Sequence, residues 1–157
     1  MKSLVSSCNN QNGTAMIIAI MVLALITIAG VMATRTSTTE VQISTSDQIY
    51  KISFYAAEAA KAYVMYNTDL YGSANIAPGN PVSFPDAGDP AAEQLVVAGS
   101  NQSYNGEVEY LNSSLPPRGS GFQAGKFKAH VYEMTCIGHG PRNSETTIQA
   151  GFYRIGF

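Results

Sequence analysis

The sequence predicts an α+β protein, in which a long N-terminal helix packs against a small C-terminal antiparallel sheet. Three observations predict this fold. An uncharged apolar run occupies residues 14–34, apolar and small residues continue beyond it at helical spacing, and strand-like stretches separated by turn residues occupy the last third. The 157 residues leave room for one such domain and a membrane anchor, but not for two full domains.

The composition is that of a folded protein with no strong charge. Apolar residues make up 45% of the chain and charged residues 13%, and the net charge is -2. A sequence pI near 5.6 lacks the basic footprint that nucleic-acid-binding proteins carry. We therefore expect no nucleic-acid partner.

The apolar run from Thr14 to Thr34 holds 21 residues without a charge. As a helix it is about 31 Å long, which matches the hydrocarbon core of a bilayer. A polar leader ending in Gly13 precedes it, whereas an ordinary secretory signal is cut after a shorter apolar core. One alternative is an uncleaved signal anchor whose first residues stay in the cytoplasm.

The helix is expected to continue beyond the membrane to about Leu70. Steps of three and four residues place small and apolar side chains on one stripe there. The stretch from Gly30 to Thr39 is the weakest part of this helix, because it contains a glycine and several β-branched residues. Gly72 is the expected stop. The stripe consists of Val41, Thr45, Ile49, Ile52, Ala56, Ala59, Tyr63, Tyr66 and Leu70.

The remainder of the chain is predicted to form a small sheet. Turn residues dominate from Gly72 to Pro90, which indicates a loop. We expect strands at 102–111, 126–137 and 146–155, and either a short strand at 95–99 or the end of a helix that begins near Ala91. Both alternations of the middle strand contain apolar residues, so its buried face is ambiguous. The amphipathic half of the helix would cover one face of the sheet.

The N-terminal half resembles type IV pilin-like proteins. A hydrophilic leader ending in glycine, an apolar run of about twenty residues, a polar spacer and the motif FYAAEAAKAYV (Phe54–Val64) together resemble PilX-type minor pilins. This resemblance implies that a prepilin peptidase cuts after Gly13 and methylates Thr14. It also implies four parts: a cleaved leader (1–13), the transmembrane or filament-core half of the helix (14–34), its amphipathic half (35–70), and a head outside the cytoplasm (71–157).

One residue departs from the pattern of major pilins. Those proteins carry a glutamate as the fifth mature residue, which is thought to pair with the N-terminal amine of a neighbouring subunit. The corresponding residue here is Ile18, which cannot form that pair. In lacking this glutamate, the chain resembles minor pilins of a tip or priming complex, including some pseudopilins of type II secretion.

The resemblance also singles out the motif Ala56, Ala57, Glu58 and Ala59. Glu58 has two interpretations: a specific packing role in the head, or a solvated charge whose weak partner is Lys61.

No pattern for catalysis or metal binding is present in the sequence. His130 and His139 lack the nearby carboxylates or thiols of a metal site, so we expect a strand residue and a turn residue, respectively. Asp86 and Asp89 lack the spacing of a calcium loop and are expected in turns. Cys136 is expected to be a small buried hydrophobe. We expect no enzyme activity, cofactor or metal.

The sequence thus predicts a structural subunit, of the minor tip or priming type, of a type IV pilus or a type II secretion pseudopilus. The alternative is a signal-anchored envelope binding domain outside any filament. The resemblance implies other pilin-like subunits, the prepilin peptidase and an inner-membrane assembly platform as partners, with a tip adhesin as a further candidate. It places the protein in the bacterial inner membrane before assembly, and in a surface pilus or periplasmic pseudopilus afterwards.

Overall fold

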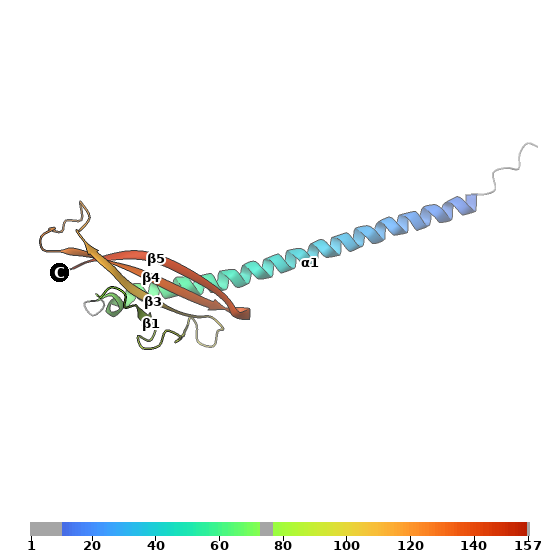
Figure 1. Ribbon diagram of the computed structural model, residues 1–157. Helices are drawn as coiled ribbons and strands as arrows, with labels where there is room; N and C mark the ends of the chain where they lie inside the picture. Colours follow the sequence, from blue (N-terminus) through green and yellow to red (C-terminus); the bar gives the residue numbers. More distant parts are fainter. Residues whose placement is uncertain (1–10, 73–76, 157) are drawn as a thin grey trace, which may run out of the picture. The chain divides into compact units, whose positions relative to one another are not determined.

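The computed structural model describes residues 11–72 and 77–156, and it confirms the α+β prediction. Two compact units divide the chain, one ending at Thr45 and the other beginning at Ser46. The elements, labelled in Figure 1, are α1 (Gln11–Tyr66), η1 (Thr68–Tyr71), β1 (Val82–Phe84), β2 (Gln94–Leu95), β3 (Ser103–Ser114), β4 (Lys128–Gly140), η2 (Pro141–Asn143) and β5 (Ser144–Gly156).

In the first unit, the described residues 11–45 form an unbroken helix. The helix persists through the Gly30–Thr39 stretch, where threonine hydroxyls donate hydrogen bonds to carbonyl oxygens four residues back. Thr34 bonds Gly30 at 2.9 Å and Thr38 bonds Thr34 at 2.9 Å. These threonine hydroxyls are satisfied within the helix, so they leave no unpaired polar group in this stretch.

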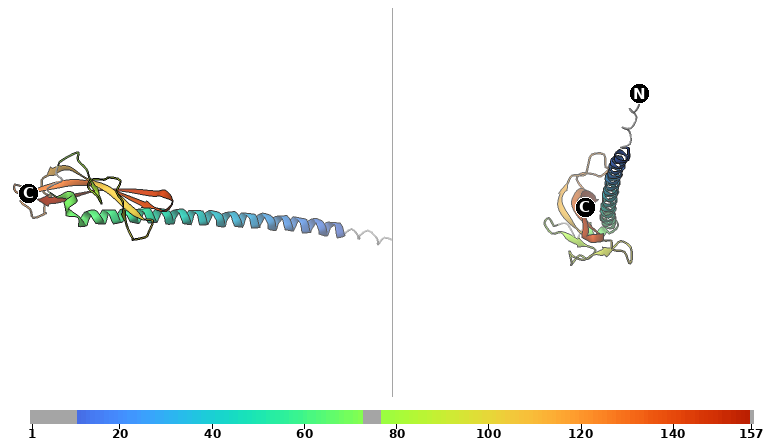
Figure 2. Two further views of the ribbon diagram at one scale, coloured as in Figure 1. Left: turned by 90° about the horizontal axis from the view of Figure 1, so that it is seen from below. Right: turned by 90° about the vertical axis from the view of Figure 1, so that its right-hand side faces the viewer.

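In the second unit, the sheet has the strand order β1-β3-β4-β5, with β2 also paired to β3, and every pairing is antiparallel. Residues 46–66 of α1 lie along one face of this sheet (Figure 2). Ala60 and Val64 of the helix share one apolar core with Phe84, Val108 and Tyr132 of the strands. The predicted covering of one sheet face by the helix is confirmed.

The helix ends at Tyr66 and not near Leu70, which corrects the predicted boundary. Asn67 adopts φ -101° and ψ 87°, outside the helical region, and the next four residues form the 3-10 turn η1. This turn buries Leu70, and it lets the Tyr71 hydroxyl donate a hydrogen bond to the Met65 carbonyl at 3.0 Å. Leu70 was expected on the apolar stripe of a continuing helix. It is buried instead because the chain turns into η1 after Tyr66.

The three long strands were predicted. β3 and β4 begin one and two residues later than expected and end three residues later, whereas β5 is longer than expected at both ends. β1 lies in a segment expected to be loop, because three residues are too few for a periodic signal. The short strand β2 overlaps the strand expected at 95–99 only at Leu95, and residues 96–99 form bends and turns. A helix beginning at Ala91 is wrong. The ambiguous middle strand turns Tyr132, Met134 and Cys136 into the core.

Candidate functional site

The predicted processing border lies in the first turn of α1. Gly13 and Thr14 are both exposed, and a Cβ placed on Gly13 would meet no atom within 4 Å. A glycine within a helix costs about 1 kcal/mol relative to alanine. Nothing among the described residues therefore requires a glycine at position 13.

The first unit exposes an uninterrupted apolar surface, which we call the apolar helix surface. Its large side chains are between 48% and 67% exposed, although contiguous apolar patches of this kind are rare on soluble monomers. By length and composition this helix is able to cross a membrane. The surface consists of Met16, Ile17, Ile18, Ile20, Met21, Val22, Leu23, Leu25, Ile26, Ile28, Val31 and Met32.

Ile18 is one ordinary member of this surface, with 61% of its area exposed. An isoleucine there matches its apolar neighbours, and no charge interrupts the helix until Arg35. The surface is thus built to be covered along its whole length by lipid or by other apolar helices.

Farther along α1, the alanines of the predicted motif contact the sheet through what we call the small-residue seam. Ala56 and Ala57 have no exposed surface, and Ala59 is partly buried against the core. Across from them lies Gly138 of β4: a Cβ on this glycine would stand 2.2 Å from the Ser53 carbonyl oxygen and 2.3 Å from the Ala57 nitrogen. The helix backbone therefore lies directly on the strand backbone, which only glycine permits.

A pair of hydroxyls, one buried and one partly buried, lies beside this seam. Ser53 is 1% exposed, its Oγ donates to the Tyr50 carbonyl at 3.0 Å, and its Oγ also lies 2.7 Å from the Thr146 hydroxyl. Because Ser53 has one hydroxyl proton, Thr146 is the donor between the two side chains. The pair gives a buried polar group its partners and ties the helix to β5.

Sequence reasoning missed Gly138, Ser53 and Thr146 as a set. A glycine inside a strand often marks the close approach of another backbone, but the strand predicted at 126–137 ended one residue before Gly138, so this signal was not used.

Glu58, between the buried alanines, lies at the surface. Its Oε2 is 2.6 Å from Lys61 Nζ, and both side chains are about one third exposed. Exposed pairs of this kind contribute little to stability. The ion pair of the second interpretation is present, and the described packing in this motif is made by the alanines.

The polar residues weighed as ligands have other roles. Asp86 accepts a hydrogen bond from the Gly88 amide at 3.0 Å and Asp89 accepts one from the Ala91 amide at 2.9 Å, as turn residues do. His139 lies in β4 and not in a turn, which corrects the prediction, and its Nε2 is 3.0 Å from Asn105 Oδ1. Within residues 11–72 and 77–156, no three His, Cys, Asp or Glu side chains form a metal-binding group.

Cys136 is fully buried in the core, as expected. Burial raises the pKa of its thiol to about 11, since the low-dielectric core disfavours the thiolate. The thiol is therefore protonated at neutral pH, and a protonated thiol is a poor nucleophile.

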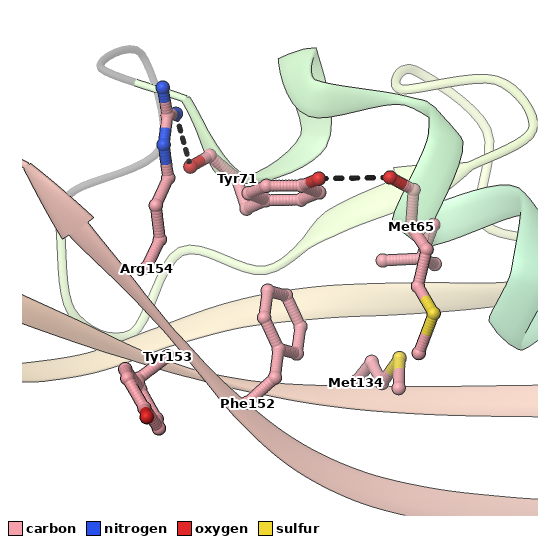
Figure 3. Close-up of a pocket in the computed structure, with 7 residues that line it drawn as sticks. Met65, Tyr71, Met134, Phe152, Tyr153 and Arg154 are labelled. Atoms are coloured by element: carbon pink, nitrogen blue, oxygen red, sulfur yellow. Dashed lines mark hydrogen bonds between the residues drawn. The ribbon is translucent and has the colours of Figure 1, made fainter. Parts of the chain in front are cut away.

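A cavity of about 200 Å³ opens between the end of α1 and β5 (Figure 3). Arg154 Nη1 donates a hydrogen bond to the Tyr71 carbonyl at 3.2 Å. The Tyr71 and Phe152 rings pack edge to face, with 5.2 Å between their centroids. These contacts fix the chain after the helix against β5. The cavity walls are Val64, Met65, Tyr71, Met134, Phe152, Tyr153 and Arg154, which include no acid–base pair.

The comparisons with known proteins identify the N-terminal region. A family model described as PilX N-terminal matches residues 12–61, about a third of the chain, and the match includes Gly13, Ile18 and Glu58. No curated protein and no solved structure matches. Residues 12–61 therefore match the PilX N-terminal model, in the region where the sequence resembles PilX-type pilins.

Proposed function

We propose that the chain is a minor subunit, of the tip or priming type, of a type IV pilus or a type II secretion pseudopilus. A prepilin peptidase cuts after Gly13 and methylates Thr14, and residues 14–34 hold the protein in the inner membrane with its head outside the cytoplasm. The assembly platform then transfers the helix into the filament, beside other pilin-like subunits and, at a tip, an adhesin.

One observation carries this proposal: a glycine that no described contact requires stands directly before an exposed apolar helix surface. Gly13 has open space around its Cα, and the apolar helix surface begins within three residues of it, at Met16. A peptidase that needs a small residue before the scissile bond explains the glycine, and a cut there starts the mature chain at the apolar surface.

The apolar helix surface supplies the free energy of assembly. Lipid tails are as apolar as these side chains, so helices exchange lipid for one another mainly through van der Waals packing. Thr34, Thr36, Thr38 and Thr39 bond their hydroxyls within the helix, so in the next two turns these side chains add little to the cost of desolvation, and the charge of Arg35 is its main source.

Ile18 supports the minor type. A subunit without a carboxylate here offers no partner for a neighbour's N-terminal amine, so it fits positions where that neighbour is missing. The tip of a filament is such a position.

The test of processing compares two glycines of the same helix. Gly13 and Gly30 both have open space around them, so Gly13→Val and Gly30→Val make the same chemical change in similar surroundings. In cells that contain the peptidase, we expect the parent and Gly30→Val to lose residues 1–13, while Gly13→Val stays uncut because its side chain crowds the scissile peptide. Intact-mass spectrometry of the membrane fraction measures both outcomes.

Two results would decide against the proposal. Cutting of Gly13→Val at the parental rate would remove the role assigned to the glycine. A parent chain that keeps its leader would favour the alternative, a signal-anchored envelope binding domain.

A further inference from the structure

Charge is segregated along the head. Residues 77–110 contain five acidic residues and no basic one, whereas residues 111–132 contain three basic residues and no acidic one. The three basic residues are Arg118, Lys126 and Lys128. A chain of net charge -2 therefore places three positive charges in one short segment, which connects β3 to β4 and includes the first residue of β4.

All three basic side chains are exposed. In the described part of the chain, none of them forms an ion pair, in contrast to Lys51 and Lys61 on α1, which pair with Asp47 and Glu58. The described residues thus leave these three charges without a charged partner. We call residues 115–128 the basic loop.

The basic loop also presents apolar side chains to solvent. Leu115 is 72% exposed and Phe122 is 48% exposed. The Phe122 and Phe127 rings pack edge to face, with 5.2 Å between their centroids. Next to the loop, Leu111 occupies the point where the register between β3 and β4 shifts, and it is 41% exposed. Apolar side chains beside unpaired basic ones are typical of segments that bind a membrane surface.

Local hydrogen bonds shape the loop. The Ser120 amide donates to the Pro117 carbonyl at 3.1 Å, and the Lys126 amide donates to the Gln123 carbonyl at 3.0 Å. The loop projects beyond the ends of β3 and β4, at the end of the sheet opposite η2 (Figure 1). An extended flat partner can therefore reach it without meeting the rest of the sheet.

We propose that the basic loop binds an anionic lipid surface. The three basic side chains attract lipid phosphates, while Leu115 and Phe122 enter the boundary between headgroups and acyl chains. A nucleic acid or an acidic polysaccharide would use the same charges, but it offers no apolar phase for Leu115. The bilayer is thus the partner that accounts for both classes of side chain, and this inference does not depend on whether the chain enters a filament.

The experiment must separate this contact from the membrane anchor. The full chain is therefore reconstituted into phosphatidylcholine nanodiscs, whose lipid covers the apolar helix surface. These nanodiscs are then floated with vesicles of phosphatidylcholine alone or of phosphatidylcholine with phosphatidylglycerol. We expect flotation with the anionic vesicles only, and less of it at high salt.

Variants of the loop should weaken this binding in two ways. Lys126→Gln or Arg118→Gln should each reduce vesicle affinity about fivefold, as expected for one basic residue near an anionic surface. The double variant Leu115→Ser with Phe122→Ser should weaken it at least as much, because the apolar contact is lost. Arg142→Gln removes an exposed charge in η2, at the other end of the sheet, and is the matched control without effect.

Three outcomes would overturn the proposal. These are equal binding to neutral and anionic vesicles, no binding to either, and anionic binding that the Leu115 and Phe122 substitutions leave unchanged. The last result, or displacement by inorganic phosphate or single-stranded DNA, would indicate a simple polyanion site.

Discussion

Gly138→Ala is expected to destabilise the head by at least about 3 kcal/mol, at the upper end of what overpacking costs. The added Cβ would stand 2.2 Å from the Ser53 carbonyl oxygen, 2.3 Å from the Ala57 nitrogen and 2.9 Å from the Ala57 Cα. All three are backbone atoms, so no side-chain rotation relieves the contact. The helix must lift from the sheet, which separates Ser53 from Thr146 and opens the core beside Ala57.

Gly151→Ala is the matched control for this prediction. Gly151 lies in the adjacent strand β5, and the atom nearest to a Cβ added at this position is the Tyr132 carbonyl oxygen at 3.8 Å, an ordinary contact. Thermal unfolding of the full chain in detergent should show a loss of at least roughly 12 °C for Gly138→Ala and little change for Gly151→Ala. Equal unfolding temperatures for the two variants would show that helix and strand do not touch as described.

Ile18→Glu is expected to reduce incorporation into filaments at least tenfold while leaving the amount in the membrane unchanged. In the membrane, position 18 lies near the start of the apolar run, so a carboxylate there can reach the interface. In packed helices at a position without a neighbouring amine, the carboxylate is buried unpaired, which costs several kcal/mol unless it takes up a proton.

Ile18→Val controls for the change in side-chain shape and should assemble like the parent. Quantitative immunoblotting of sheared filaments and of membranes measures both pools. Incorporation of Ile18→Glu at or above the parental level would show that an amine partner is present, and would contradict the placement proposed from Ile18.

The elements that could be predicted are those specified by local pattern. The apolar run located the start of α1 within a few residues, and alternation located β3, β4 and β5. The stop at Tyr66 could not be predicted, because Leu70 continues the helical stripe in sequence although η1 buries it. The strand β1 is too short for a pattern, and its pairing with β3 depends on contacts distant in sequence.

The site shows the same division. Gly13, Thr14 and Ile18 could be proposed from the sequence because the resemblance rests on the order of residues along the chain, and their roles stay predictions. The small-residue seam was not found, because the contact of Ala57 with Gly138 depends on how the helix lies on the sheet. The sequence likewise does not show that the basic side chains of the basic loop are exposed and have no ion-pair partner among the described residues. Both facts require the folded structure.

The most direct test of the account is mass spectrometry of the chain recovered from purified filaments. We expect a mature N-terminus at methylated Thr14, no trace of residues 1–13, and an amount far below that of the main subunit. A chain that is absent from filaments, that keeps its leader, or that is the most abundant subunit would contradict the assignment as a processed minor pilin.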